Sequence, residues 1–468
     1  MNIKKAITKV FSANFIQLLA GIIVGFVVPA ILPIKEYAEL KTYTLLISYV
    51  GLLHFGYLDG LSIKYGGKNF KNIDKGILKG EHKFISIAEM IISLLILLIG
   101  ILTENLVFIL FAITILPANL CTFYKGVFQA TGEFNQYTKV IKVYTLIYTA
   151  LNIILALLLK SKIYVLYCLA IFISHSVTLM IFEIKLRKNY GNIKPIKPTD
   201  IKNVTKMGIL VLLGNLSVVA LFGIDKWFVK LFLTTEDFAY YSFAVSMLNI
   251  INTLFNAISV TFYNYLFTNN SNESIEKLKN YLITLGGFAS LGYFALAFIV
   301  KYFMKKYILS LNIIAITFSV FPYMILINAL YVNLYKVNKN EKKYFKVVVS
   351  MLMISIIYNI IAVVIFKNTI SIAFATVLTL ITWVIYSTYD LKNVKITKKM
   401  YIYMFSLTIF FLICTQCFNW LAGGIIYLVM FIALTWILNK NVIKECYEML
   451  NNSIKKLKNE RKKENDKS

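Results

Sequence analysis

Apolar stretches long enough to cross a lipid bilayer occupy most of this 468-residue chain. A transmembrane helix needs about 20 consecutive apolar residues, because it rises about 1.5 Å per residue and the hydrocarbon core is about 30 Å thick. Such stretches lie at 11–33, 40–60, 84–103, 105–127, 140–159, 163–184, 207–230, 239–267, 281–300, 311–335, 347–366, 369–389, 401–418 and 421–438. The sequence therefore predicts an all-α integral membrane protein with about 14 transmembrane helices.

The distribution of charge predicts the orientation of these helices. A net charge of +27 would suggest nucleic acid binding in a soluble protein, but here 59% of residues are hydrophobic and the lysines gather between the apolar stretches. The gaps after the second, sixth, tenth and twelfth stretches are rich in lysine, and most other gaps are not. By the positive-inside rule we expect a multi-pass protein of the cell membrane with both termini in the cytoplasm and no nucleic acid partner. Lys301, Lys305 and Lys306 depart from this pattern, because they would lie outside.

Patterns typical of enzymes or cofactor sites are missing from the sequence. Cys414 and Cys417 form a CxxC pair, but they lie inside an apolar stretch without a second Cys or His pair nearby, so we interpret them as packing residues. Paired carboxylates and metal-spaced histidines are also missing. We therefore expect a protein that is not an enzyme, with no catalytic residue, cofactor or metal.

The two halves of the chain share one plan. Pro117 in the fourth apolar stretch corresponds to Pro322 in the tenth, and Asn152 in the fifth corresponds to Asn359 in the eleventh. Internal repeats of this kind are common in transporters. We expect two pseudo-symmetric six-helix bundles, with a central cleft at their interface, followed by two additional helices.

These features predict the domain organisation. We expect an N-terminal six-helix lobe at 1–190, a cytoplasmic linker at 191–206, a C-terminal six-helix lobe at 207–391, two additional helices at 401–438 and a charged cytoplasmic tail at 439–468.

Ionisable residues inside the first half are candidates for a functional role, because a charge at the bilayer centre costs about 2.5–3.5 kcal/mol even on a lenient scale. His54, Glu89 and His175 could bind a coupling ion or a proton. For the two histidines, a hydrogen bond between helices is the alternative. For Lys125, late in the fourth stretch, the alternative to cargo binding is snorkelling to the inner interface.

Polar residues of the seventh and eighth stretches are further candidates for a cavity lining. Asp225 and Lys226 lie towards the outer end of the seventh stretch, where snorkelling to the membrane surface is the alternative explanation for Lys226. In the eighth stretch, spacings of three and four residues place a polar series on one helical face. The series consists of Asn249, Asn252, Asn256, Ser259 and Tyr263. It could form hydrogen bonds between helices, worth about 0.6 kcal/mol each, or line a cavity for hydroxyl-rich cargo. Both interpretations stay open.

Several segments resemble bacterial oligosaccharide-repeat flippases. These are the O-antigen and capsule exporters of the polysaccharide transporter family, within a superfamily that includes multidrug antiporters and the lipid-linked peptidoglycan precursor flippase. The resemblance is carried by "FGYLDGLSIKYGGK" at 55–68, "YKGVFQATGEFNQY" at 124–137, "GIDKWFVKLFL" at 223–233 and "AYYSFA" at 239–244. The chain departs from relatives with arginine-lined cavities, because Arg187 and Arg461 are its only arginines.

The resemblance implies a fourteen-helix, two-lobed transporter that alternates between inward-open and outward-open states. Its cargo would be a polyprenyl-diphosphate-linked sugar repeat unit, assembled in the cytoplasm and delivered outside for polymerisation in lipopolysaccharide or capsule biosynthesis. Membrane lipids, glycosyltransferases and a polysaccharide polymerase are the implied partners, and we expect a monomer. On this basis Lys125 would attract the diphosphate and Gln129 a sugar near the cytoplasmic mouth of the cleft.

Two alternatives remain at the level of sequence. A multidrug or cation antiporter would have the same fold. A membrane polysaccharide polymerase or glycosyltransferase would handle the same lipid-linked sugars, although such enzymes generally need a sizeable extramembrane loop or domain.

Overall fold

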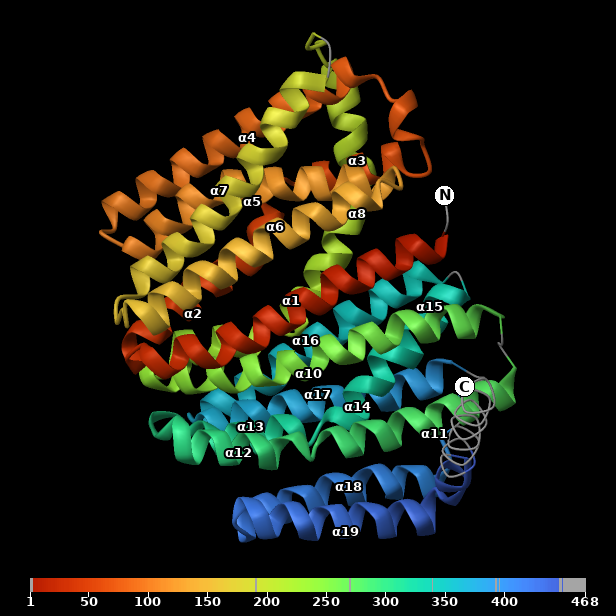
Figure 1. Cartoon of the computed structure of the whole chain (residues 1–468). Helices are drawn as coiled ribbons and strands as arrows, with labels where there is room; N and C mark the ends of the chain where they lie inside the picture. The colour runs from red at the N-terminus through yellow and green to blue at the C-terminus, as the bar shows by residue number, and fades with distance from the viewer. Residues whose placement is uncertain are drawn as a thin grey trace, which may run out of the picture. The chain divides into compact units, whose positions relative to one another are not determined.

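The computed structural model describes residues 3–189, 192–268, 271–338, 340–391, 394, 396–445 and 448. All regular secondary structure within these residues is helical. In this part of the chain, 12 helices are long and apolar enough to cross a membrane, or up to 14 if each of two bent helix pairs counts as one span. The prediction of an all-α membrane protein with about 14 spans is therefore confirmed. Figure 1 shows the course of the helices.

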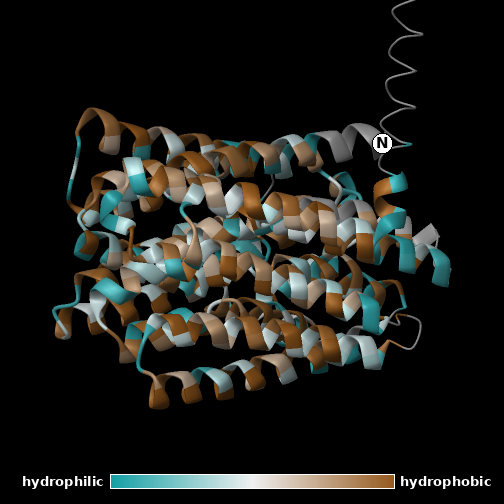
Figure 2. Cartoon of the chain, turned by 90° about the horizontal axis from the view of Figure 1, so that it is seen from below, coloured by the Kyte–Doolittle hydropathy of each residue, from teal (hydrophilic) through white to brown (hydrophobic). Residues whose placement is uncertain are grey.

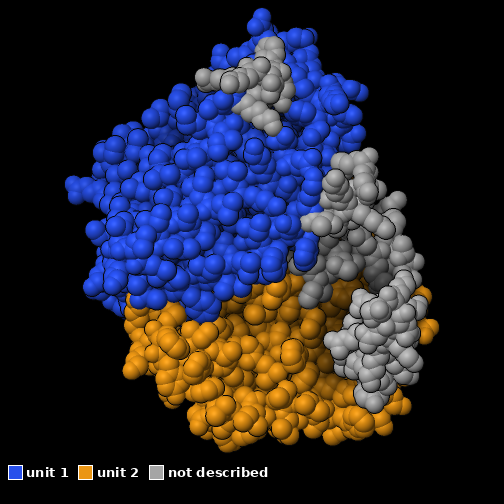
Figure 3. Space-filling model, viewed as in Figure 1, with its two compact units in different colours: residues 1–246, 348–353 blue, residues 247–347, 354–468 orange. Residues whose placement is uncertain are grey.

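The chain divides into two compact units, which are coloured in Figure 3. Unit 1 comprises Met1–Ser246 with Val348–Met353, and unit 2 comprises Met247–Val347 with Ile354–Ser468. The elements that begin in unit 1 are α1 (Ile3–Ile31), α2 (Ile34–Ser48), η1 (Val50–Leu52), α3 (Tyr57–Tyr65), η2 (Phe70–Asn72), α4 (Lys75–Leu102), α5 (Leu106–Ala130), α6 (Phe134–Ile153), η3 (Ile154–Leu158), α7 (Tyr164–Asn189), α8 (Pro198–Leu221), α9 (Ile224–Phe232) and α10 (Thr235–Thr268).

Unit 2 contains the remaining helices and the rest of α10. They are α11 (Asn272–Ala289), α12 (Gly292–Phe303), η4 (Lys305–Tyr307), α13 (Ser310–Phe318), α14 (Phe321–Leu326), η5 (Ile327–Tyr331), α15 (Val332–Val337), α16 (Glu341–Ile365), α17 (Thr369–Asp390), α18 (Lys398–Cys417) and α19 (Trp420–Leu438). Helices α18 and α19 pack side by side, as Figure 1 shows. The predicted tail at 439–468 lies largely outside the described residues.

Hydrophobic residues occur along most of the helices, as the colouring of Figure 2 shows, and many large apolar side chains are exposed. On α4, Leu94, Leu98 and Leu102 are 56%, 53% and 75% exposed. A soluble monomer rarely leaves so continuous an apolar surface in water, so this face of α4 is suited to contact lipid.

The second span is broken between α2 and α3, which are bent by 52°. At the break, Phe55 and Gly56 have positive φ angles of 48° and 82°. A left-handed conformation costs glycine little, so Gly56 is well suited to bend the chain here.

Small residues bring α3 into close contact with α8. A Cβ atom built on Gly208 would lie 1.9 Å from the carbonyl oxygen of Gly56, and one built on Gly60 would lie 2.0 Å from the carbonyl oxygen of Val204. Gly56 and Gly60 form a GxxxG motif, which allows two helix backbones to approach without intervening side chains. The conformation at "FGYLDG" thus depends on glycine both for its turn and for its packing.

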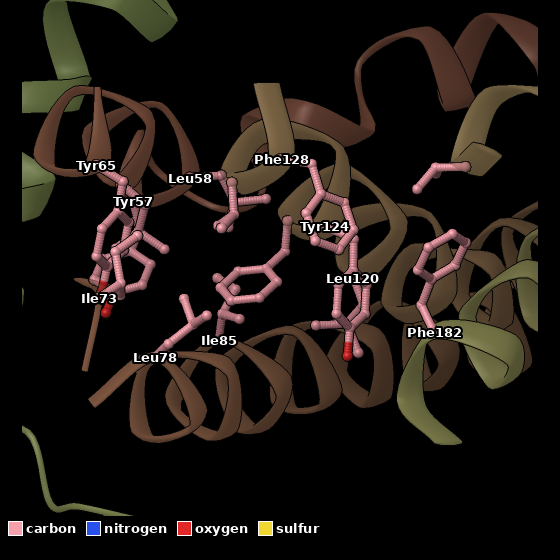
Figure 4. Packing of buried hydrophobic residues seen from close by; sticks show 14 of the residues in the cluster. Tyr57, Leu58, Tyr65, Ile73, Leu78, Ile85, Leu120, Tyr124, Phe128 and Phe182 are labelled. Carbon is pink, nitrogen blue, oxygen red and sulfur yellow. The ribbon is translucent and has the colours of Figure 1, made fainter. Parts of the chain in front are cut away.

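A buried aromatic and aliphatic cluster holds α3, α4, α5 and α7 together (Figure 4). Tyr124 and Phe128 on α5 lie with their ring centroids 5.7 and 5.9 Å from the ring of Phe182 on α7. Next to this cluster, the fully buried carboxylate of Glu81 accepts hydrogen bonds of 2.5 Å from Lys64 and from Tyr65. Pairing offsets the desolvation cost of the buried carboxylate, and loss of either partner would leave it uncompensated, so this contact favours the packing of α3 against α4.

The seventh span differs from its predicted bounds of 207–230. Helix α8 begins at Pro198, where proline suits the first turn of a helix, and it ends at Leu221. Phe222 and Gly223 separate it from the nine-residue helix α9. A Cβ atom at Gly223 would lie 3.0 Å from the hydroxyl oxygen of Tyr49, so this position favours glycine. Asp225 and Lys226 consequently belong to a separate short helix.

The segment before α8 lies along the N-terminal end of α4. The backbone N–H of Lys194 donates to the carbonyl oxygen of Gly76, and its ammonium group donates to Asp74 at 2.7 Å. Asp74 also caps α4 by accepting from the N–H groups of Gly76 and Ile77. The hydrogen bond from Lys194 and those from the two N–H groups lower the pKa of Asp74.

The contact between Asp74 and Lys194 should be lost in acid. A carboxylate whose pKa is lower in the folded state stabilises that state above its unfolded pKa of about 3.9, and the effect disappears as the pH falls below this value. A spin label attached at position 197 should therefore become more mobile as the pH is lowered from about pH 5 to about pH 2. In Asp74→Asn the label should be mobile throughout this range. Unchanged mobility of the label in the otherwise wild-type chain, with the fold retained, would contradict this contact.

Candidate anion-binding site

Lys125 lies in unit 1 beside His175, one of the other residues selected from the sequence. Lys125 is half-buried near the end of α5, and its ammonium group is close enough to interact electrostatically with the thiol of Cys121 and the ring of His175 on α7. The thiol donates to the backbone carbonyl of His175 at 3.3 Å. The Nδ1 atom of His175 is buried without a hydrogen-bond partner. This corner of the unit therefore combines a cation with an unused polar atom.

Lys226 on α9 lies near a second lysine, Lys41 on α2, which the sequence analysis did not select. The two ammonium groups are close enough to interact electrostatically. Lys41 donates to the hydroxyl of Ser246 on α10 at 2.9 Å and lies 5.0 Å from the ring centroid of Tyr37. Both lysines are half-buried.

Tyrosine side chains connect these two lysine positions. The ring of Tyr144 on α6 lies 4.3 Å from that of His175 and 5.8 Å from that of Tyr148, to which it is nearly parallel. Tyr148 in turn interacts electrostatically with Tyr37, beneath Lys41. We call Lys41, Lys125, Lys226, His175, Tyr144 and Tyr148 the lysine cluster.

Carboxylates do not balance the lysine cluster within the described part of the chain. No described Asp or Glu oxygen lies within 4.0 Å of the ammonium groups of Lys41, Lys125 or Lys226, whereas five other described lysines form such pairs. Asp225 interacts electrostatically with its neighbour Lys226, but its carboxylate accepts from the Tyr241 hydroxyl at 2.7 Å and from the Lys226 backbone N–H at 2.9 Å. Lysine side chains of this kind attract anions as point charges and lack the forked geometry of arginine.

Gln129 lies one helical turn beyond Lys125 and is exposed at the end of α5. The prediction that it contacts a sugar stays a prediction.

The polar series on α10 contacts the π-helical turn η5 in unit 2. Asn252 accepts from the side chain of Asn328 at 3.0 Å, and Ser259 donates to the backbone carbonyl of Asn328 at 2.7 Å. Asn333 returns a hydrogen bond to the hydroxyl of Ser259 at 3.1 Å. These bonds correspond to the first of the two interpretations given above. Turns of this type expose backbone groups that need partners, and frequently occur at functional sites.

The remaining members of the series behave differently. Asn249 is exposed, and its backbone carbonyl accepts from the Thr253 hydroxyl. The side chains of Asn256 and Tyr263 lie outside the described part of the structure. Asn249, Asn256 and Gln129 as cargo contacts therefore stay predictions.

His54 lies at the break of the second span, 6% exposed. Its Nδ1 atom accepts from the N–H of Gly56 at 3.2 Å, and its Nε2 atom lies 3.9 Å from Asp59. Asn215 of α8 donates to the same carboxylate at 3.4 Å. The three side chains therefore lie next to the glycine contact between α3 and α8.

Glu89 lies apart from these groups on α4. It is fully buried, and neither of its carboxyl oxygens has a hydrogen-bond partner. Asn119 on α5, which is also fully buried, faces it.

The fold was compared with those of known proteins. Neither a protein-family model nor a curated protein matches the chain. The structure of the lipid II flippase MurJ in an inward closed conformation matches with a TM-score of 0.70 and 14% identity, over 94% of this chain and 99% of that one. A multidrug resistance MATE family transporter of the MOP superfamily, in an inward-facing conformation, matches with a TM-score of 0.60 and 13% identity, over 83% of this chain and 98% of that one.

A MOP superfamily transporter from Pyrococcus furiosus Vc1 also matches, with a TM-score of 0.50 and 13% identity, over 84% of this chain and 97% of that one. It is described as having a binding pocket of reverse polarity that suggests a different function. Because these identities are low, the similarity concerns the fold. The chain has the multi-span fold that the lipid II flippase MurJ shares with transporters of the MOP superfamily.

Proposed function

We propose that the chain is a flippase for a polyprenyl-diphosphate-linked oligosaccharide repeat unit. It moves the unit by alternating access from the cytoplasmic to the outer face of the cell membrane, with both termini in the cytoplasm. Glycosyltransferases supply the cargo and a polysaccharide polymerase consumes it, as in O-antigen or capsule synthesis. The protein acts as a monomer.

The observation that carries this proposal is the lysine cluster. A diphosphate is an anion, and charged groups are costly to move through hydrocarbon unless they are paired. Lys41, Lys125 and Lys226 offer three ammonium groups that no described carboxylate pairs within 4.0 Å. Hydrogen bonds between charged donors and phosphate oxygens are about twice as strong as those between neutral groups.

The sugar part of the cargo presents a second barrier. Each hydroxyl that loses water without gaining a partner costs about 4–8 kcal/mol in an alkane-like phase. The hydroxyl groups of Tyr144 and Tyr148 and the unpartnered Nδ1 atom of His175 provide polar atoms beside the lysines. A lipid tail needs no such atoms, because it can remain in the bilayer.

The fold also supports a second candidate, an antiporter of cationic drugs, because a MATE family transporter shares it. The charge of the lysine cluster argues against that cargo. Like charges repel each other, and the repulsion is stronger in a medium of low dielectric than in water. A cation would therefore be excluded from the site that attracts a diphosphate.

A transport assay with two probes distinguishes these functions. The purified chain in proteoliposomes is offered either a polyprenyl diphosphate with a fluorescent sugar or a fluorescent lipophilic quaternary ammonium ion. We expect the first probe to become accessible to an impermeant quencher much faster than in protein-free vesicles, and the second to be unaffected. If only the ammonium probe were transported, in exchange for sodium or protons, the chain would be an antiporter and the proposed flippase function would be wrong.

A further inference from the structure

Two buried residues of unit 1 leave three polar atoms without partners at one place. Both carboxyl oxygens of Glu89 and the Oδ1 atom of Asn119 lack a hydrogen bond, and both residues are 0% exposed. All three atoms are acceptors when Glu89 is ionised, so they cannot satisfy one another. One additional proton on Glu89 changes this, because the carboxylic acid then has an O–H group that can donate.

Among the described residues, no basic side chain has a nitrogen atom within 4.0 Å of the Glu89 carboxyl oxygens. From α5, Asn119 faces the carboxyl group, while Cys121 and Lys125 face His175. His82, two turns earlier on α4, is 2.7 Å from Glu183 of α7 and thus has its own partner. An ionised carboxylate at this position would be buried and unpaired, which is among the most costly arrangements in a membrane protein.

Asn119 connects this carboxyl group to the broken second span. Its Nδ2 atom donates to the backbone carbonyl of Val50 at 3.2 Å. Val50 is the first residue of η1, which lies between the bent helices α2 and α3. When Glu89 is neutral, its O–H group can donate to Asn119 Oδ1, and the amide N–H remains on Val50. When Glu89 is ionised, its carboxylate repels Asn119 Oδ1 and attracts the Nδ2 amide group, and turning the amide to bring Nδ2 to the carboxylate would move Nδ2 away from Val50.

We propose that Glu89 and Asn119 form a proton-binding site, and that proton release loosens the backbone at the break between α2 and α3. This inference is independent of the cargo, because it concerns only residues of α4, α5 and η1. A proton suits the site better than a metal ion such as sodium does. One donor and one acceptor are enough to hold a proton, whereas hard metal ions are bound by several oxygen ligands, about six or more for Mg²⁺ and Ca²⁺.

The chain contains an internal control for a chemical test. Glu81 lies eight residues before Glu89 on the same helix and is equally buried, but it is paired with Lys64 and Tyr65. Dicyclohexylcarbodiimide is apolar and reacts with protonated carboxyl groups. In the purified full chain at neutral pH, mass spectrometry should find the adduct at Glu89 with a yield about tenfold or more above that at Glu81, because a buried ion pair must break before it can react.

The pH dependence of the reaction at Glu89 tests whether this residue binds a proton. The yield at Glu89 should fall as the pH is raised, and Glu89→Gln should abolish the adduct at this position without loss of the fold. An absent adduct at neutral and acidic pH, or equal yields at the two glutamates, would refute the proposal. Protection of Glu89 by sodium but not by potassium at constant pH would also refute it, in favour of a sodium site.

The link to the second span needs a separate measurement. At a pH where Glu89 no longer reacts, the backbone amides of residues 49–56 should exchange hydrogen several-fold faster in the wild-type chain than in Glu89→Gln, which stays neutral. At acidic pH the two chains should exchange at the same rate. Equal rates at both pH values would show that Asn119 does not transmit the protonation state to the break.

Discussion

Gly208→Ala is expected to separate α3 from α8 and to prevent stable folding of unit 1. The added methyl group would lie 1.9 Å from the carbonyl oxygen of Gly56, far inside van der Waals contact. The obstacle is backbone and cannot rotate away, so the helices must move apart. Overpacking of this kind costs about 1–3 kcal/mol or more, and the effect here should reach or exceed the upper end of this range. Thermal unfolding in detergent, followed by size-exclusion chromatography, measures the loss.

The matched control for this variant is Gly21→Ala. Gly21 is also inside a helix, but a Cβ atom there has no other atom within 4 Å. Because alanine favours helix by about 0.5–1 kcal/mol over glycine, this variant should be at least as stable as the wild type. Gly60→Ala should behave like Gly208→Ala, since its Cβ would lie 2.0 Å from the carbonyl oxygen of Val204. A Gly208→Ala protein with the melting temperature of the wild type would disprove the close packing of α3 on α8.

The combined replacement of Lys41, Lys125 and Lys226 with glutamine is expected to abolish binding of inorganic pyrophosphate and transport of the diphosphate-linked probe. A hydrogen bond to a charged group contributes about 1.5–3 kcal/mol, so each lysine that contacts the anion should account for about a tenfold or greater loss of affinity. Glutamine keeps a long polar side chain, and the fold should survive, because none of the three lysines forms a described ion pair. Stabilisation of the chain by pyrophosphate against thermal unfolding measures the binding.

Lys71→Gln provides the control for net charge for each single lysine variant such as Lys41→Gln, because it also removes one positive charge and Lys71 is exposed on η2. It should leave both binding and transport unchanged. The single variant Lys41→Gln tests the residue that the sequence analysis missed. If the folded triple variant bound pyrophosphate as strongly as the wild type, the lysine cluster would not be the anion-binding site, whatever the cargo is.

The spans of this fold could be predicted from the sequence, but their breaks could not. Hydropathy detects a continuous apolar stretch, and the stretch at 40–60 is apolar across the point where α2 and α3 diverge by 52°. The break depends on Gly56, whose conformation only becomes necessary because α8 approaches there. Likewise, α8 ends at Leu221 inside the apolar stretch at 207–230, and Tyr49, which is distant in sequence, lies close to Gly223 just after this end.

The candidate sites show the same limit. Lys125 and Glu89 could be selected because a charge inside an apolar stretch is conspicuous. Lys41 stands at the edge of its stretch, where a lysine ordinarily marks the membrane surface, and its nearness to Lys226 depends on the placement of α9. Asn119 carries no charge and does not stand out in its apolar stretch. Nothing in the sequence therefore indicates that it faces the carboxyl group of Glu89.

Because no described carboxylate oxygen lies within 4.0 Å of the ammonium groups of Lys41, Lys125 or Lys226, the resting protein has a further property. A group of cations without a nearby carboxylate attracts counterions from the solution, so we expect chloride or phosphate to bind at the cluster when no cargo is present. On the proposed function, each cargo molecule would enter by displacing these small ions and would leave by yielding to them. Exchange of this kind needs contacts that are easily broken, which single ammonium groups provide better than forked guanidinium groups do.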